Sequence, residues 1–138
     1  MEQKDLGYLA GIIDGEGSIS INCLTRLNNT KNYRAYVSVT NTNNELLLVC
    51  KALLEELAEK PLSVQLIDQR GRRPVYRLRE QSKRGVHKIL LAVLPYLVAK
   101  KKQAEEVLNF LEFACGSTEQ VESRSKVVAF NRGVSSNS

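Results

Sequence analysis

The sequence predicts an α+β fold, in which helices cover one face of a four-stranded antiparallel sheet. The predicted elements follow the order helix, two strands, helix, two strands and then helices, and the strands alternate apolar with polar side chains. Helices packed on the apolar face would leave the other face polar. The 138 residues have the size of one domain, which we expect over 1–133, with 134–138 as a flexible tail.

The first helix is predicted over about residues 5–14, ending at Gly15 and Gly17. Its apolar residues recur at helical spacing and are Leu6, Leu9, Ile12 and Ile13. Two strands follow over 18–26 and 33–41, joined by a turn-forming segment over 28–32. The apolar positions expected to face the helices are Ile19, Ile21, Cys23, Ala35, Val37 and Val39.

A second helix is predicted over about 44–59, capped by Thr42 or Asn43 and ending before Pro61. Its expected buried stripe is Leu46, Val49, Leu53, Leu54 and Leu57. The second pair of strands is predicted over 62–69 and 74–80. In the first of these strands the inward face stays open, because Leu62, Val64 and Leu66 compete with Ile67.

Three further helices are predicted over about 82–94, 98–115 and 118–131. Ser117 and Gln120 have the spacing of a capping box for the last of them, and Gly133 would end it.

Basic side chains are concentrated in the second half of the chain. The whole protein carries 20 Lys and Arg against 15 Asp and Glu, and residues 70–102 contain eleven basic residues and one acid, Glu80. Such a surface favours a polyanion, because binding one releases condensed counterions. A lysine-rich solvated helix face is the alternative interpretation.

The composition argues against several other classes of protein. No apolar run approaches the roughly 20 residues that span a bilayer, and the first residues lack the order of a signal peptide. Cys23, Cys50 and Cys115 are too far apart for a disulfide framework or a zinc site, and His87 is the only histidine. We expect no membrane partner, no small-molecule substrate, and a reduced intracellular compartment, either an organelle (chloroplast or mitochondrion) or the prokaryotic cytoplasm.

The segment 9–17, Leu-Ala-Gly-Ile-Ile-Asp-Gly-Glu-Gly, contains the most informative pattern. Gly7 and Gly11 lie four residues apart and allow close approach of another helix, from the same chain or from a partner. Asp14 and Glu16 place two negative charges at a helix C-terminus, where the dipole disfavours each anion by about 0.3–1 kcal/mol. A bound cation would offset this cost, and carboxylates with backbone carbonyls and water are typical ligands of Mg²⁺.

This segment resembles the signature of the LAGLIDADG homing endonucleases. The predicted element order is similar to the αββαββα core of that family, with its saddle-shaped sheet, followed by additional C-terminal helices. The segment 94–104 resembles the part of the family that contains its active-site lysine. A single motif in 138 residues is similar to the single-motif branch, whose members act as homodimers.

The resemblance implies that Glu16 lies against a scissile phosphate and binds the metal, together with the carbonyl of Gly15. Many relatives have aspartate at the position of Glu16, so this chain differs there by one methylene.

The resemblance also implies roles for two further polar residues. Lys100 would stabilise developing charge or orient water, with Lys101 and Lys102 as alternatives in register. Asn41 matches a position that organises solvent around the metals. Glu45 stands where some relatives have a basic residue. The role of that basic residue is therefore not carried over to Glu45.

Two motif helices would cross at the dimer axis, and Asp14 is expected to be a structural acid and not a metal ligand. The residues implied at this interface are Gly7, Ala10, Gly11 and Asp14. The polar face of the sheet would lie in the major groove of DNA. The residues implied to contact DNA are Ser20, Asn22, Arg26, Arg34, Tyr36, Ser38, Arg70, Arg72, Arg77 and Arg79.

By resemblance, the function is that of a site-specific homing endonuclease encoded within an intron or an intein. The homodimer would make a Mg²⁺-dependent staggered break in a near-palindromic double-stranded site of about 20 base pairs. Mn²⁺ would substitute, and Ca²⁺ would bind without supporting cleavage. An RNA-binding intron maturase and a non-cutting DNA-binding regulator are the alternatives. Glu16 and Lys100 favour the nuclease, because a pure binder gains nothing from an acid aimed at phosphate.

Overall fold

The computed structural model describes residues 1–68, 73–113 and 118–131. Its elements are α1 (Gln3–Glu16), β1 (Gly17–Thr25), β2 (Lys31–Asn41), α2 (Asn44–Ala58), β3 (Val64–Asp68), β4 (Val75–Glu80), α3 (Lys83–Val93), the 3-10 turn η1 (Leu94–Tyr96), α4 (Lys101–Glu112) and α5 (Thr118–Asn131). The strands form one antiparallel sheet in the order β1-β2-β4-β3. The predicted α+β class is confirmed.

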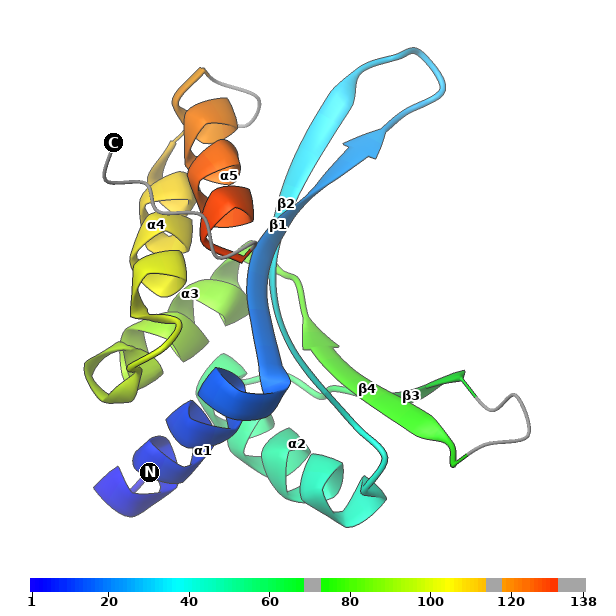
Figure 1. Ribbon diagram of the computed structural model, residues 1–138, viewed down its shortest axis with the longest axis vertical. Coiled ribbons are helices and arrows are strands. Elements are labelled where there is room, and N and C mark those ends of the chain that lie inside the picture. The colour runs from blue at the N-terminus through cyan, green and yellow to red at the C-terminus, as the bar shows by residue number, and fades with distance from the viewer. Residues whose placement is uncertain (69–72, 114–117, 132–138) are drawn as a thin grey trace.

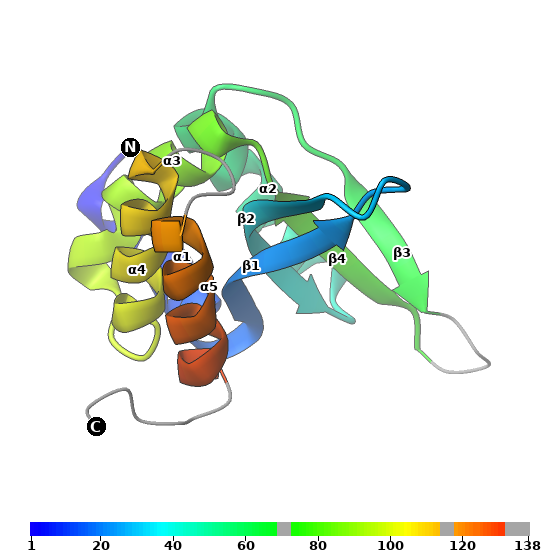
Figure 2. The ribbon, with the colours of Figure 1, turned by 90° about the horizontal axis from the view of Figure 1, so that it is seen from above.

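The helices lie on one side of a strongly curved sheet, and the other face of the sheet is uncovered (Figure 1). Seen from above, α1, α3, α4 and α5 gather on the covered side (Figure 2). None of the helices formed by the described residues combines the length and the hydropathy needed to cross a membrane.

The alternation predicted for β1 and β2 is confirmed. Ile19 pairs with Val37 and Ile21 with Ala35, and all four side chains are buried under the helices. Cys23, at the end of this row, is only half-buried. The pairing buries one face of the hairpin and directs the polar positions of both strands to the opposite face.

α1 is longer than predicted, because it continues through Gly15 and ends at Glu16. The chain then turns directly into β1 at Gly17, whose N–H donates to the carbonyl of Ile13. A Cβ at Gly17 would lie 2.8 Å from Ile13 Cα and 3.0 Å from the carbonyl oxygen of Ser38. Only glycine fits this close approach, which places Glu16 at the junction of helix and sheet.

The buried stripe predicted for α2 is confirmed in part: Leu54 is fully buried, and Leu46, Leu53 and Leu57 are partly buried against the core. The side chains that face the core are Leu47, Cys50, Leu54 and Ala58, whereas Val49 is 49% exposed. Leucines occur on several sides of this helix, so apolar spacing alone did not identify the side that packs against β2 and α3. The predicted cap is confirmed for Asn43, whose side chain accepts a hydrogen bond from the Leu46 N–H (3.2 Å).

The inward face of β3 is defined by its pairing with β4. Val64 lies opposite Leu78 and Leu66 opposite Tyr76, so these residues share the helix side of the sheet. Gln65 lies opposite Arg77 and faces outward. The connection between these two strands is predicted over 70–73, and of it only Arg73 belongs to the described residues.

The C-terminal region differs from the prediction mainly at the start of α4. That helix begins at Lys101 and not at residue 98, because η1 and a short loop intervene. Residues 115, 117 and 133, predicted as a helix end, a capping residue and a terminator, lie outside the described residues. Gln120 donates from Nε2 to the carbonyls of Phe110 (3.1 Å) and Phe113 (3.3 Å), which fastens α5 to α4.

Candidate functional site

Glu16 and Asn41 meet where α1 joins the sheet. The Asn41 side chain donates from Nδ2 to Glu16 Oε2 (3.2 Å), and its Oδ1 accepts from the Asn43 N–H (2.8 Å). Because the carbonyl end of this amide is occupied by Asn43, its NH₂ group is directed at the carboxylate. Among the described residues, Glu16 has no other hydrogen-bond partner, so its second oxygen is left for a ligand.

Asp14 ties a distant loop to the end of α1. Its carboxylate accepts from the N–H groups of Val98 (2.8 Å) and Lys100 (3.0 Å). Lys100 Nζ donates in turn to the backbone carbonyl of Asp14 (2.6 Å). Each oxygen of the Asp14 carboxylate is therefore engaged by a backbone donor, and the Lys100 ammonium lies at the negative end of the α1 dipole.

Of the three consecutive lysines, Lys100 is the one that the structure brings to α1. Lys101 and Lys102 are exposed on α4, and the Lys102 ammonium lies 6.0 Å from the ring centre of Phe130. Glu16, Asn41 and Lys100 thus gather at one end of one helix, where they are held by hydrogen bonds between segments far apart in the sequence.

The oxygen donors at this end of α1 suit a hard cation. Glu16 and Gly15 are both exposed, and they offer a carboxylate and a helix-terminal carbonyl. Within the described residues of one chain, no group of three His, Cys, Asp or Glu side chains could hold a metal.

Most of the predicted DNA contacts lie on the outer face of the sheet. Asn22 lies opposite Arg34, and Ser20 lies opposite Tyr36. Arg26 is exposed at the β1–β2 turn. This face presents hydroxyl, amide and guanidinium groups at neighbouring positions, which is the kind of surface that reads base edges.

Arg77 and Arg79 are neighbours in the middle of this face. The Arg79 guanidinium lies 4.3 Å above the ring centre of Tyr36, and Arg77 donates to Gln65 Oε1 (3.3 Å). Burial lowers the pKa of Arg79, and the charge of Arg77 lowers it further. The Nε atoms of both arginines are buried without a partner among the described residues. The buried Nε atoms are out of reach of a ligand, but two neighbouring guanidinium charges on this face favour an anionic one.

Two predicted site residues are buried, and two more fall outside the described residues. Ser38 is only 4% exposed, because it is covered in the row between Ser18 and Arg79, so it is not available for a direct contact. Ala10 is fully buried in the core of its own chain and is not on the exposed side of α1. Arg70 and Arg72 lie outside the described residues.

Gly7 and Gly11 lie on the exposed side of α1. A Cβ built at either position meets nothing within 4 Å among the described residues. Packing within this chain therefore does not require glycine there. This decides against the prediction that the two glycines accommodate another helix of the same chain.

Sequence reasoning missed the anchoring contacts around the site. Gln65 was not assigned to the outer face, although the Val64 and Leu66 alternation would have placed it there. The bonds from Asp14 to the loop at 98–100 join residues 84 and 86 positions apart, and no local pattern in the sequence marks them.

The fold resembles solved homing endonucleases bound to DNA. I-CvuI, in complex with the I-CreI target and 2 mM Mg with the DNA not cleaved, has a TM-score of 0.73 at 21% identity, over 93% of this chain and 82% of its own. The group I intron-encoded homing endonuclease I-CeuI, complexed with DNA, has a TM-score of 0.62 at 20% identity, over 80% of this chain and 55% of its own. The LAGLIDADG homing endonuclease I-SmaMI, bound to cleaved DNA, has a TM-score of 0.63 at 19% identity, over 98% of this chain and 45% of its own.

The comparison of sequences gives the family directly. Among curated protein sequences, none matches this chain significantly. The family model of the LAGLIDADG-like domain matches residues 3–92, which include α1 and the whole sheet. The chain therefore belongs to the LAGLIDADG family and has the fold of its homing endonucleases.

Proposed function

We propose that this protein is a homing endonuclease that acts as a homodimer on double-stranded DNA. The observation that carries the proposal is the arrangement at the end of α1. There Asn41 holds one oxygen of Glu16, the other oxygen has no partner among the described residues, and Lys100 is fastened to the same helix end. A carboxylate and an ammonium held beside a polar, basic sheet suit the hydrolysis of a phosphodiester.

The exposed glycines of α1 support a homodimer. Gly7 and Gly11 leave the helix backbone open for close approach by a second copy, and the chain contains one motif. The chain also aligns with less than half of the I-SmaMI chain, as one of two similar units would. Two copies crossing at α1 would bring both Glu16 carboxylates toward one axis, and each would serve one DNA strand.

Mg²⁺ is the metal that the donor set favours, held by Glu16 and the Gly15 carbonyl. When bound, a divalent ion would activate water and stabilise the leaving oxygen. Lys100 would add a fixed positive charge beside the scissile phosphate. Mn²⁺ would substitute, and Ca²⁺ would allow binding without cleavage; related I-CvuI–DNA structures were obtained in Mg and in Ca.

The outer face of the sheet would read bases in the major groove. Arginine suits guanine and asparagine suits adenine, each good pair contributing about 1–3 kcal/mol of discrimination. A symmetric dimer with two such faces would prefer a near-palindromic site of about 20 base pairs. Such a site, cut with staggered ends, fits a protein encoded in an intron or an intein and made in an organelle or a prokaryotic cell.

Cleavage of a randomised duplex library in Mg²⁺, with sequencing of the cut ends, tests the proposal. We expect a long, near-palindromic consensus with staggered ends, absent with Glu16→Gln and retained with Glu2→Gln at the far end of α1. Capture of the same consensus without any cutting would contradict the nuclease and indicate a DNA-binding regulator. A library that is neither cut nor enriched would contradict DNA as the partner. Intron RNA would then be the partner to test.

A further inference from the structure

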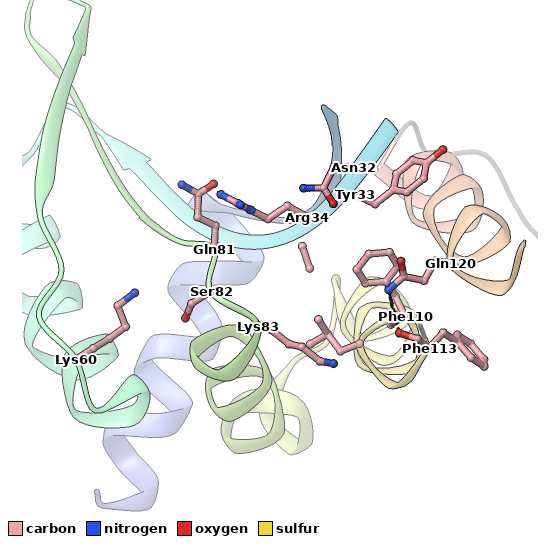
Figure 3. A pocket seen from close by; sticks show the side chains of 12 residues that line it. Asn32, Tyr33, Arg34, Lys60, Gln81, Ser82, Lys83, Phe110, Phe113 and Gln120 are labelled. Atoms are coloured by element: carbon pink, nitrogen blue, oxygen red, sulfur yellow. Dashed lines mark hydrogen bonds between the residues drawn. The ribbon is translucent and has the colours of Figure 1, made fainter. Parts of the chain in front are cut away.

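A cavity of about 540 Å³ opens beside the sheet, away from the end of α1. β4 ends at Glu80, which pairs with Val37, so residues 31–36 of β2 extend beyond it with β1 on one side only. The cavity lies along this free edge. Its other walls come from the β4–α3 corner and from the ends of α4 and α5 (Figure 3).

The floor of the cavity offers little surface to a ligand. Phe110 is 2% exposed and Leu111 is 7% exposed, so both belong to the margin of the core. Gln120 is also buried, with its amide on the carbonyls at the end of α4. The groups that a ligand can reach are therefore those of the rim.

The rim is cationic. Arg34 from β2, Lys60 after α2 and Lys83 at the start of α3 surround the same space (Figure 3), and none of the described residues that line it is acidic. Lys60 pairs with Glu80 (3.2 Å), whose carboxylate is buried and also accepts from the N–H groups of Gln81 and Ser82. Among the described residues, Arg34 and Lys83 have no acidic partner. The positive end of the α3 dipole adds to the field.

We propose that this cationic rim binds phosphate groups of the DNA backbone that flank the bases read by β1 and β2. The inference rests on the proposed function and adds a contact that carries no sequence information. A protein that reads base edges must also hold the sugar–phosphate backbone, and phosphate contacts fix its register on the duplex. The rim is suited to this task, since Arg34 belongs both to the outer face of the sheet and to the cavity.

The test compares three variants on two duplexes, one with the selected site and one with the same bases scrambled. Lys83→Gln removes a rim charge from an exposed position, so folding is not at stake. Lys4→Gln removes an equal charge from the far end of α1, where the lysine is 80% exposed. Arg79→Ala removes a predicted base contact. Affinity is measured without divalent ions, across a series of salt concentrations.

We expect Lys83→Gln to lower the affinity for both duplexes by the same factor. The plot of log affinity against log salt should become shallower by about 0.9 for each lost contact, and so by about twice that for a dimer. Lys4→Gln should leave the slope unchanged, and Arg79→Ala should weaken binding to the selected site more than to the scrambled duplex.

The inference would be overturned if Lys83→Gln, Lys4→Gln and wild type gave equal salt slopes. The free edge of β2 would then be a place for a peptide strand to pair. A loss confined to the selected site would also overturn it, because Lys83 would then read bases. In either case the wild type still binds and cuts the selected site, so the proposed function stands. If the wild type bound neither duplex, the result would contradict both this inference and the proposed function.

Discussion

Lys100 shows how much of the candidate site depends on single side chains. Lys100 reaches the end of α1 because the Asp14 carboxylate accepts hydrogen bonds from the backbone N–H groups of Val98 and Lys100. The Lys100 ammonium in turn donates a hydrogen bond to the Asp14 carbonyl. Glu16 is held in the same way by one amide, that of Asn41. The groups that position these two side chains, Asn41 and Asp14, are not assigned as metal ligands, and Glu16 depends on one hydrogen bond whereas Lys100 depends on three.

We expect Lys100→Met to lower the cleavage rate by about 10²–10³, because a positioned charge at the reacting phosphate is lost. Lys101→Met, one residue further along, should cut at close to the wild-type rate. Single-turnover cleavage of the selected site measures both. Equal rates for the two variants would contradict the assignment of Lys100.

At the scale of elements, the junction between α1 and β1 depends on Gly17. A Cβ there would lie 2.8 Å from Ile13 Cα, so Gly17→Ala should destabilise the fold by about 1–3 kcal/mol. Gly7→Ala, on the open side of the same helix, should stabilise the free chain by about 0.5–1 kcal/mol. Urea unfolding at low protein concentration gives both values, and opposite signs are the expected result.

The connection from α2 to β3 depends on a carboxylate. Glu55 accepts from the Leu62 N–H (2.7 Å) and pairs with Lys51, and these contacts, the first above all, lower its pKa. Because the pKa is lower in the folded state, the stabilisation is present above the ordinary carboxyl pKa and is lost as the pH falls through the folded value. The urea midpoints of wild type and Glu55→Gln should therefore differ at pH 7 and converge toward pH 3. A gap that stays constant would show that Glu55 acts through something other than its charge.

At the scale of the whole molecule, local patterns predicted most of the elements and the polar outer face. The alternation in β1 and β2 is strong because one face is buried along the full hairpin, so Ile19 and Val37 were placed correctly. The buried side of α2 was predicted only in part, with Val49 wrongly included and Leu47 left out, since its leucines surround the helix and only packing selects among them. The loop bonded to Asp14 and the burial of Ser38 follow from tertiary contacts that no local spacing records.

The assembly is the other property of the whole molecule. Gly11→Leu should leave the fold of the free chain intact, because a Cβ there meets nothing within 4 Å among the described residues. It should prevent close approach of two α1 helices and so convert a dimer into a monomer with unchanged circular dichroism. Sedimentation equilibrium measures the mass, and a Gly11→Leu protein that remains a dimer would place the interface elsewhere.

The central claim is that Glu16 performs chemistry on DNA that the sheet has already bound. The most direct test measures both the affinity and the cleavage rate of Glu16→Gln on the selected site. The predicted result is unchanged or tighter binding in Mg²⁺ with cleavage abolished, since the variant loses a charge and not a surface. Cleavage by Glu16→Gln at the wild-type rate would contradict the claim.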